Sequence, residues 1–566
     1  MSGKAAKDIN IVVSGAAGQG IKTVEKLLSR LLAKTGRYVH STKEYMSRVR
    51  GGSNSTDLRV SPEPVDCPVR RVDLLLALDG PSVEHMSGRI AGDTLVVASG
   101  EVLEEHDDLQ AKTAPVDFED LAEEAGRSVY SNTVAAGVVS GALGVELDRC
   151  LSVLEDFFHE YGDDEIKGNK AAFESGFRRG GELEADLRVD AGDAGGRLLL
   201  SGGTAVGLGA LAGGVRFMCS YPMSPSTAVL VFLAQNSRRF GIVVEQAEDE
   251  ISAVNMGLGA WYTGARAMIT TSGGGLALMS EGISLSGMLE TPMVFHVAQR
   301  PGPATGLPTR TGQEDLELVL HAGHGEFPRI VLAPGNLSQA FSLTARAFML
   351  AEKHQVPVFI LTDQNLMDSF YQVPELPLDG VDTERFLTEA DEGYERYPVD
   401  RKAVPPMAVP GSGTGLVCVD SDEHDQAGHI TEDLDLRVRM VDRRLGKMRA
   451  VAEDVLDPEL SGDGPHIAVC WGSTRNACLE AVRNMGRDDL AVLHIPQPYP
   501  LSSEVSEILG EAETIITVEG NATGQFGRLL RDLTGITPDA EILRYDGLPF
   551  RADTLKDDLS SQLEGR

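Results

Sequence analysis

The sequence predicts an α/β fold that is divided over several domains. Its 566 residues are too many for a single hydrophobic core, so we expect three or four domains. Short, nearly continuous apolar runs such as 74–78 and 357–361 alternate with stretches whose apolar residues recur at helical spacing. Apolar strands that alternate with helices are typical of parallel sheets with both faces covered.

The charge balance disfavours two classes of partner. The chain has 85 acidic and 51 basic residues, a net charge of −34, which repels nucleic acids and anionic membranes. This acidity, together with 38 arginines against 13 lysines, is typical of a salt-tolerant or high-GC host, and an ordinary soluble acidic enzyme has the same signature. No apolar run is long enough to span a bilayer and no signal-peptide core follows Met1, so we expect a cytoplasmic protein.

The six cysteines are scattered along the chain, and no two have the CxxC spacing of zinc or iron–sulfur sites. Isolated thiols in such a chain are most simply interpreted as small buried residues. We therefore predict no metal site in this chain. Any iron–sulfur cluster would have to belong to another chain.

The first segment, 8–180, opens with a strand at Ile9–Val13, a glycine-rich turn and a helix from Ile21 to about Leu32. Backbone N–H groups at a helix N-terminus attract anions, and a nearby arginine adds fixed positive charge. The glycine order differs from the dinucleotide fingerprint, and Lys22 is one position out of register for a P-loop. A tight turn without a ligand is the alternative. The residues that would form a phosphate cradle here are Gly15, Gly18, Gly20 and Arg50.

A polar connector at 181–196 leads to a second α/β segment, 197–373, with five apolar strands. The stretch 374–464 is richer in Pro, Asp and Glu, and we interpret it as a long connection with one helix near Val438–Val455. The last segment, 465–566, returns to the alternation of strands and helices.

The loop Tyr221–Thr227 is the most informative feature of the second segment. Two prolines fix its backbone, so the hydroxyl of Ser224 is presented without a large ordering cost. A simple turn between a strand and a helix is the alternative for these seven residues alone.

Three further motifs follow predicted strands of the same segment. Glu250 begins a helix at the edge of its buried face, although acidic residues are favoured at a helix start in any case. Ser272 and Gly273 open a glycine turn after a strand, and Arg300 stands in a proline-rich loop with Thr305. An arginine at a strand's carboxyl end can fork onto a carboxylate, although a structural ion pair would look the same. All these loops follow the carboxyl ends of strands, where open α/β sheets bind ligands.

In this order, the motifs resemble the α subunit of 2-oxoacid:ferredoxin oxidoreductases over nearly the whole chain. The loop Tyr221–Thr227 is similar to the family signature YPITPST, and 248–250, 271–273 and 300–306 match in the expected order. The family loop GPSTG reads Gly302 to Gly306 with alanine at 304. The recurring family pieces WGS and EGNATGQ stand at 471–473 and 519–525.

The resemblance implies a fold class and a set of domains. The fold is α/β and multidomain, with an N-terminal γ-type α/β domain, a thiamine-diphosphate pyrimidine-binding parallel-sheet domain and a transketolase C-terminal-like α/β domain. The implied boundaries are 8–180 for the γ domain, 197–373 for the pyrimidine-binding domain, 374–464 for the connecting segment and 465–566 for the last domain.

The resemblance also implies the activity and the site. The enzyme would decarboxylate a 2-oxoacid, most simply 2-oxoglutarate, to an acyl-CoA and pass electrons to ferredoxin. Glu250 would be catalytic, hydrogen-bonding the pyrimidine ring nitrogen of thiamine diphosphate. Substrate would be bound by Ser224, Arg300 and Thr305, cofactor by Tyr221, Pro222, Ser272 and Gly273, and CoA by Gly15, Gly18, Gly20 and Arg50.

Half of the cofactor site is missing from the sequence. The turn Gly462–Gly464 has the letters GDG, but Pro465 follows and no asparagine pair appears downstream. The resemblance therefore implies a β subunit that holds the diphosphate, Mg²⁺ and the iron–sulfur cluster, in an (αβ)n assembly, with (αβ)2 as the expected form.

Three alternatives stay open. The substrate could be pyruvate or a branched-chain 2-oxoacid. The enzyme could be a non-redox thiamine enzyme of transketolase type, or the chain could be a non-catalytic CoA- or nucleotide-binding regulatory subunit.

Overall fold

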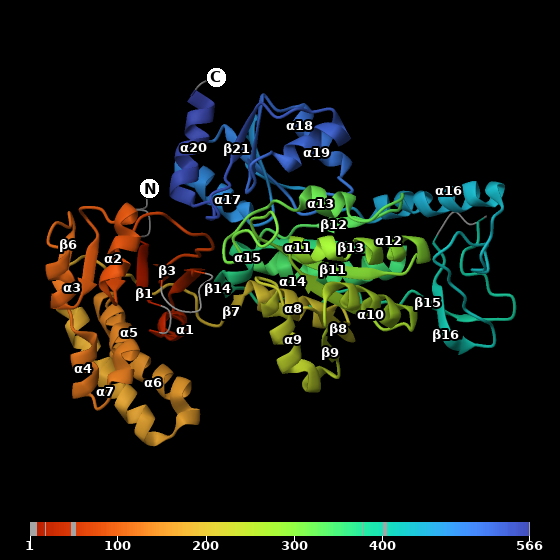
Figure 1. Cartoon of the computed structure of the whole chain (residues 1–566). Coiled ribbons are helices and arrows are strands. Elements are labelled where there is room, and N and C mark those ends of the chain that lie inside the picture. Colours follow the sequence, from red (N-terminus) through yellow and green to blue (C-terminus); the bar gives the residue numbers. More distant parts are fainter. Residues whose placement is uncertain (1–7, 17–18, 47–51, 377, 400–403, 565–566) are drawn as a thin grey trace. The chain divides into compact units, whose positions relative to one another are not determined.

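Strands of the computed structural model form four sheets within the described residues, which are 8–16, 19–46, 52–376, 378–399 and 404–564. The chain divides into two units (Figure 1). The first unit comprises Met1–Ser201, Asp368–Glu375 and Arg551–Leu555, and the second comprises Gly202–Met367, Leu376–Phe550 and Lys556–Arg566.

The first unit is built on an eight-stranded sheet in the order β6-β5-β4-β1-β3-β2-β14-β7. Its strands are β1 (Ile9–Ala16), β2 (Tyr38–Glu44), β3 (Ser53–Ser61), β4 (Leu74–Ala77), β5 (Leu95–Ala98), β6 (Lys112–Pro115), β7 (Leu198–Ser201) and β14 (Phe370–Val373).

The expectation of a parallel sheet was wrong for half of this sheet. β1, β4, β5 and β6 pair in parallel, whereas β3 pairs antiparallel with both β1 and β2, and β14 with β2 and β7. Only the short stretch 45–52 joins β2 to β3, and a parallel connection needs a helical crossover of a dozen or more residues. The two strands therefore pair as antiparallel neighbours.

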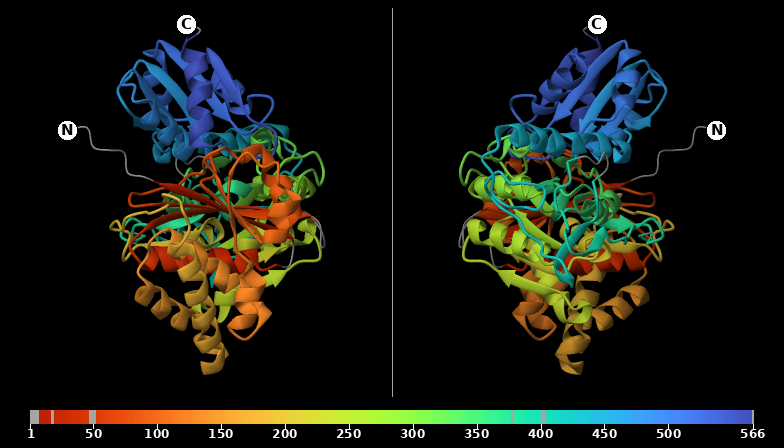
Figure 2. Two further views of the ribbon diagram at one scale, coloured as in Figure 1. Left: turned by 90° about the vertical axis from the view of Figure 1, so that its left-hand side faces the viewer. Right: turned by 90° about the vertical axis from the view of Figure 1, so that its right-hand side faces the viewer.

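Helices cover both faces of this sheet because the side chains of its strands alternate. Ile11 and Val13 of β1 belong to the core that includes the helices α1 and α5 to α7, while Val12 between them packs in the opposite core. Figure 2 shows α4 to α7 gathered below the sheet of this unit. The helices are α1 (Ile21–Lys34), α2 (Gly80–Met86), α3 (Gly100–Glu105), α4 (Phe118–Glu124), α5 (Ser131–Ala142), α6 (Leu147–Phe158) and α7 (Asp163–Gly181), with 3-10 turns η1 (Ser87–Arg89), η2 (Ser128–Tyr130) and η3 (His159–Tyr161).

Glycines bring α5 and α7 into backbone contact. A Cβ at Gly137 would lie 2.3 Å from the carbonyl oxygen of Phe173, and one at Gly176 would lie 2.1 Å from that of Val134. Any side chain at either position would separate the two helices, since a buried clash of this size forces backbone movement.

The second unit begins with a six-stranded sheet, here called the central sheet, in the order β12-β13-β11-β10-β8-β9. All of its strand pairs are parallel, as the sequence predicts. The strands are β8 (Phe217–Ser220), β9 (Val243–Gln246), β10 (Ala267–Thr271), β11 (Met293–Gln299), β12 (Ile330–Leu332) and β13 (Pro357–Asp363). The helices are α8 (Gly202–Ala212), α9 (Thr227–Phe240), α10 (Glu250–Tyr262), α11 (Gly273–Leu278), α12 (Ser280–Leu289), α13 (Leu316–His321), α14 (Leu337–His354) and α15 (Gln364–Asp368).

The connecting stretch holds more structure than the single helix that the sequence predicts. It contains a two-stranded parallel sheet, β15 (Leu387–Ala390) with β16 (Met407–Gly413), and α16 (Leu434–Val451), followed by a 3-10 turn, η4 (Ala452–Asp454). The helix starts earlier than expected because Asp433 caps it, accepting from the amides of residues 435 and 436. Glu290 anchors α16 through ion pairs with Arg443 and Lys447.

The last domain contains a five-stranded sheet, here called the C-terminal sheet, in the order β17-β19-β18-β20-β21. The strands are β17 (Glu459–Ser461), β18 (His466–Trp471), β19 (Leu490–Ile495), β20 (Thr514–Glu519) and β21 (Ala540–Leu543), and the helices are α17 (Thr474–Met485), α18 (Ser503–Gly510), α19 (Gln525–Thr534) and α20 (Ala552–Glu564). Only β17 runs antiparallel to its neighbour. Together these three α/β sheets and their helices confirm the predicted fold class. Among the described residues, none of the helices combines the length and apolar character required to span a membrane.

Candidate active site

Four neighbouring strands of the central sheet end at the predicted site. In the order β11-β10-β8-β9, their carboxyl ends lead to Arg300, Ser272, Tyr221 and the acidic run before Glu250. Because parallel strands end at one edge of a sheet, the motifs predicted from separate parts of the sequence share this edge.

Glu250 is a buried carboxylate with an unused oxygen. It is the first residue of α10, and Asp249 caps that helix by accepting from the Ser252 amide at 2.7 Å. The Glu250 side chain is 3% exposed, and its Oε1 has no hydrogen-bond partner among the described residues. A buried polar atom without a partner costs free energy, so this oxygen suits a donor from a bound molecule.

Gly275 keeps the space beside Glu250 open. A Cβ at position 275 would lie 2.7 Å from Glu250 Oε1 and 2.1 Å from Thr271 Oγ1. Any side chain here would cover the carboxylate, so the glycines of the first turn of α11 leave room for a ligand next to Glu250.

Arg300 joins two of the loops. Its Nη1 donates a hydrogen bond to the carbonyl oxygen of Ser224 at 2.8 Å, which ties the loop after β11 to the loop after β8. Partial burial lowers the pKa of Arg300, and the carboxylate of Asp315 opposes this shift. The guanidinium has further N–H donors, which are available to a carboxylate ligand.

Asp315 is a site residue that the sequence analysis missed. Both of its carboxylate oxygens lie against Gly273, where a Cβ would be 2.2 and 2.3 Å from them. Its Oδ2 is buried without a hydrogen-bond partner among the described residues. Burial, reinforced by Glu314 and opposed by Arg300, raises the pKa of Asp315 to about 7.

The sequence signal of Asp315 is ambiguous. An aspartate directly before the apolar helix Leu316–His321 is typical of a helix cap. In the structure Asp315 occupies the cap position, yet its side chain makes no capping hydrogen bond. Its carboxylate instead faces Gly273, the first residue of α11.

The remaining predicted residues of this edge differ in exposure. Ser272 and Gly273 are buried, Pro222 is half-buried, and Ser224, Thr305 and Tyr221 are exposed, the last at 41%. The Ser272 hydroxyl contacts the sulfur of Met223, the residue that stands where the family signature has isoleucine. The structure thus brings the two predicted cofactor loops into direct contact.

The glycine turn of the first unit lies beside a pocket of about 350 Å³. Gly20 has a φ of 78°, and Ala16 donates its amide to both Gln19 Oε1 and Asp79 Oδ2. Gly18 and Arg50 lie outside the described residues. The pocket is lined by Ala16, Gly20, Ile21, Lys22, Lys43, Glu44, Tyr45, Asn54, Ser55 and Thr56.

Two lysines reach this pocket, whose lining also includes Glu44. Lys22 Nζ stands 5.9 Å from the centre of the Tyr45 ring, and Lys43 Nζ lies 3.2 Å from Glu25 Oε2. The sequence analysis counted Lys22, at the start of α1, only as an out-of-register P-loop residue and missed Lys43, which reaches the pocket from β2.

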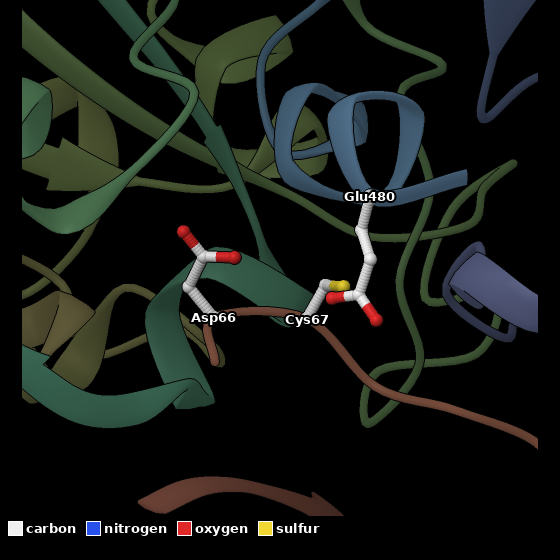
Figure 3. A group of neighbouring side chains, drawn as sticks. All are labelled: Asp66, Cys67 and Glu480. Carbon is white, nitrogen blue, oxygen red and sulfur yellow. The ribbon is translucent and has the colours of Figure 1, made fainter. Parts of the chain in front are cut away.

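Figure 3 shows the side chains of Asp66 and Cys67, neighbours in the loop after β3 of the first unit, and of Glu480 on α17 of the second unit. The prediction that this chain holds no metal stays a prediction.

Two protein families match the chain. The family described as "Pyruvate flavodoxin/ferredoxin oxidoreductase, thiamine diP-bdg" matches residues 208–443. The family described as "Pyruvate ferredoxin/flavodoxin oxidoreductase" matches residues 10–179.

Curated relatives match along nearly the full length. The chain is 30% identical to 2-oxoacid:ferredoxin oxidoreductase 2, subunit alpha, of Aeropyrum pernix, over 96% of this chain and 96% of the relative. It is 29% identical to the 2-oxoacid:ferredoxin oxidoreductase subunit alpha of Sulfolobus sp, over 97% of this chain and 96% of the relative.

A solved structure has the same fold throughout. It is the 2-oxoglutarate:ferredoxin oxidoreductase from Magnetococcus marinus with 2-oxoglutarate, coenzyme A and succinyl-CoA bound. The TM-score is 0.91 at 28% sequence identity, covering 98% of this chain and 99% of that chain.

Proposed function

This chain belongs to the α subunits of the 2-oxoacid:ferredoxin oxidoreductases, which are thiamine-diphosphate enzymes, and from that premise we propose that its substrate is 2-oxoglutarate. With a β subunit, it would convert 2-oxoglutarate and CoA to succinyl-CoA and CO2, and two electrons would pass to ferredoxin. The solved relative with 2-oxoglutarate and succinyl-CoA bound, which covers 98% of this chain, supports the choice of substrate.

The unpartnered oxygen of Glu250 is the observation that carries the catalytic part of this proposal. A buried glutamate beside an open glycine turn fits the nitrogen-rich edge of an aminopyrimidine, which can donate to the carboxyl group. Thiamine diphosphate, when bound, supplies the carbon nucleophile and the electron sink for decarboxylation. Glu250 would hold or move a proton at the ring nitrogen.

The other residues of this edge would bind and orient. Arg300 would direct its remaining N–H donors to the carboxylate of the 2-oxoacid, with Ser224 and Thr305 as hydroxyl donors beside it. Tyr221, Pro222, Ser272 and Gly273 would line the cofactor. The exposure of Ser224, Tyr221 and Thr305 leaves these side chains accessible to ligand and partner.

The β subunit would complete the site with the diphosphate groups, Mg²⁺ and an iron–sulfur cluster. The turn at 462–464 supports this division, because a Cβ at Gly464 would lie 2.1 Å from the backbone of Asp489. The turn is packed against its own domain. An (αβ)2 assembly stays part of the proposal.

The pocket of the first unit would bind CoA within a γ domain at 8–180. Lys22 and Lys43 would meet the phosphates, since the Ala16 amide is already hydrogen-bonded within the chain. Gly15 and Gly20 would permit close approach, together with Gly18 and Arg50. The domains at 197–373, 374–464 and 465–566 complete the proposed organisation, although β7 and β14 at the two ends of 197–373 pair within the first sheet and β17 near the end of 374–464 pairs within the C-terminal sheet.

The substrate is tested by purifying the chain with its β subunit and assaying 2-oxoacids with CoA and a viologen dye. We expect 2-oxoglutarate to have the highest kcat/KM. A higher kcat/KM with pyruvate or a branched-chain 2-oxoacid would contradict the proposal that 2-oxoglutarate is the substrate. A colourless complex without visible absorption would favour a transketolase-type enzyme, and a complex inactive with every 2-oxoacid would favour a regulatory subunit.

The Glu250→Gln variant tests the catalytic assignment. We expect kcat to fall by about 100-fold or more, because an amide cannot exchange a proton at the pyrimidine ring. Glu281→Gln, on the exposed first turn of α12, is the matched control and should retain wild-type kcat. Near-normal turnover of Glu250→Gln would remove Glu250 from this role.

A further inference from the structure

The C-terminal sheet reverses its strand order between β18 and β20. The chain proceeds from β18 through α17 to β19 on one side, and from β20 through α19 to β21 on the other. In open α/β sheets, the crevice at the carboxyl ends of two such strands is the place where ligands bind. Here those ends are Trp471 and Glu519, each followed by a glycine.

This crevice is filled by the side chain of Gln313, which belongs to the domain built on the central sheet, here called the central domain. The Nε2 of Gln313 donates to the Trp471 carbonyl oxygen at 2.8 Å, and its Oε1 accepts from the Gly520 amide at 2.8 Å. The backbone of Gln313 donates to the Gly520 carbonyl oxygen at 2.6 Å and accepts from Asn521 Nδ2 at 3.1 Å. Gln313 is 2% exposed, so both ends of its amide are satisfied by the C-terminal domain.

The two glycines of the crevice fit this side chain. A Cβ at Gly472 would lie 2.8 Å from Gln313 Nε2, and one at Gly520 would lie 3.2 Å from its Cγ. The C-terminal sheet therefore binds a side chain of the same protein at the position where a ligand would otherwise bind.

The C-terminal domain also contacts the residues that follow Gln313. The side chain of Gln525 donates to the Glu314 carbonyl oxygen at 2.8 Å and accepts from the Glu317 amide at 3.0 Å. Arg528 forms an ion pair with the Glu317 side chain at 2.6 Å. Figure 1 shows α13, which begins within this segment at Leu316, on the side of the central sheet next to the C-terminal domain.

Residues 313–317, which the C-terminal domain contacts, include Asp315 and are connected to the loop of Arg300. Asp315 lies between the anchored positions 313, 314 and 317, with its carboxylate on Gly273. The Glu314 side chain accepts from the Gly302 amide at 2.8 Å, which connects the segment to the loop of Arg300. Displacement of Gln313 would therefore reach both charged groups.

We propose that Gln313 is a positioning residue, through which the C-terminal domain holds Asp315 and the Arg300 loop in place for the 2-oxoacid. This inference rests on the proposed function for its kinetic consequence and on the hydrogen bonds above for its structural one. The C-terminal domain thereby holds residues 313–317 and the loop of Arg300 in position. The crevice between β18 and β20 is filled by Gln313 and not by a ligand.

The test compares Gln313→Met with Gln339→Met in the complex with the β subunit. Gln339 is the matched control because it also bridges the central and C-terminal domains, accepting from Gly335 and donating to Glu459, away from the substrate edge. For Gln313→Met we expect the KM for the 2-oxoacid to rise about tenfold, with kcat and the KM for CoA changed less than about threefold. Gln339→Met should leave all three values near wild type.

Coupling to Asp315 separates positioning from a general loss of stability. In an Asp315→Asn background, Gln313→Met should raise the KM less than about threefold, because residues that act as one unit are not additive. Full additivity, or equal rises in the KM for CoA and for the 2-oxoacid, would overturn the proposal.

Hydrogen exchange gives a readout that needs no substrate. Amides in 301–317 should exchange about tenfold faster in Gln313→Met than in Gln339→Met, because the anchor of the segment is lost. Equal exchange would overturn the positioning role of Gln313, whereas faster exchange in a complex that rejects 2-oxoglutarate would reject only the proposed substrate. Should Gln313→Met fail to fold, Gln525→Leu removes two bonds from the same segment and carries the same expectations.

Discussion

Arg300 and Asp315 present opposite charges at the same edge of the central sheet. The arginine is fixed by the Ser224 carbonyl oxygen, whereas the buried Oδ2 of Asp315 has no hydrogen-bond partner among the residues described. A negatively charged substrate that binds here is attracted by Arg300 and repelled by the ionised form of Asp315. The balance between them depends on the protonation of Asp315.

The Arg300→Lys variant tests the fork geometry. A lysine keeps the charge but offers a single ammonium in place of a planar guanidinium. We expect the KM for the 2-oxoacid to rise about tenfold, because a charge-assisted hydrogen bond is lost. Arg238→Lys, in the exposed last turn of α9, is the control, and an unchanged KM in Arg300→Lys would count against the assignment.

The pH dependence of substrate binding tests Asp315. Its pKa is raised to about 7, so the side chain is neutral below that pH and charged above it. The KM for the 2-oxoacid should therefore rise as the pH passes upward through about 7, because the carboxylate then competes with substrate for Arg300. Asp315→Asn should flatten this rise, while the exposed Glu326→Gln should preserve it.

The same shift has a consequence for stability. A carboxyl group whose pKa is higher in the folded than in the unfolded state stabilises the fold at low pH. This contribution of Asp315 to the free energy of unfolding should disappear as the pH rises through about 7. A denaturation series over pH in the wild type and in Asp315→Asn measures it, and identical slopes would contradict the assignment.

At the residue scale, the sequence predicted the position of some residues at this sheet edge and not of others. Glu250 could be predicted because it follows a strand and starts a helix with a clear apolar face. Asp315 could not, because an aspartate before a helix has a simpler explanation as a cap, and only the folded chain shows its carboxylate turned away from that role. Gln313 carries no sequence signal at all.

At the scale of elements, the period of the apolar pattern predicted the direction of strand pairing correctly in the central sheet but not in the sheet of the first unit. Central strands are apolar on both faces and connected through helices, which permits only parallel pairing. In the first unit, β3 (SNSTDLRVS) is polar along much of its length, and its antiparallel partners follow from connection length. Pairing partners are not encoded in the period of a strand.

The pocket between α1 and β2 is tested with Lys22→Met. The methionine keeps the apolar stem of the side chain and removes its charge, so the KM for CoA should rise about tenfold through loss of a phosphate contact. The KM for the 2-oxoacid should stay within about threefold of wild type. Lys26→Met, one turn further along the exposed side of α1, is the matched control, and an equal effect of both variants would reject the pocket as the CoA site.

At the scale of the whole molecule, the proposed function gives this chain the acid group, Glu250, and the substrate arginine, Arg300, and gives a β subunit the turn that would hold the diphosphate. We therefore expect the isolated chain to bind thiamine diphosphate and Mg²⁺ weakly, and the complex with the β subunit to bind them at least about 100-fold more tightly. Isothermal titration of both preparations measures this difference. Tight binding by the isolated chain would refute a shared site.

The sequence by itself determined the α/β class, the parallel central sheet and the motifs of the central domain that share its edge. These follow from local information, because apolar period, glycine and proline turns and strand ends are written in neighbouring residues. The tertiary structure alone decided the antiparallel half of the first sheet, the lysine pocket, the buried carboxylate of Asp315 and the insertion of Gln313 beside Gly520. Gln313 and Gly520 are 207 positions apart, and no local pattern specifies which side chains meet over such a distance.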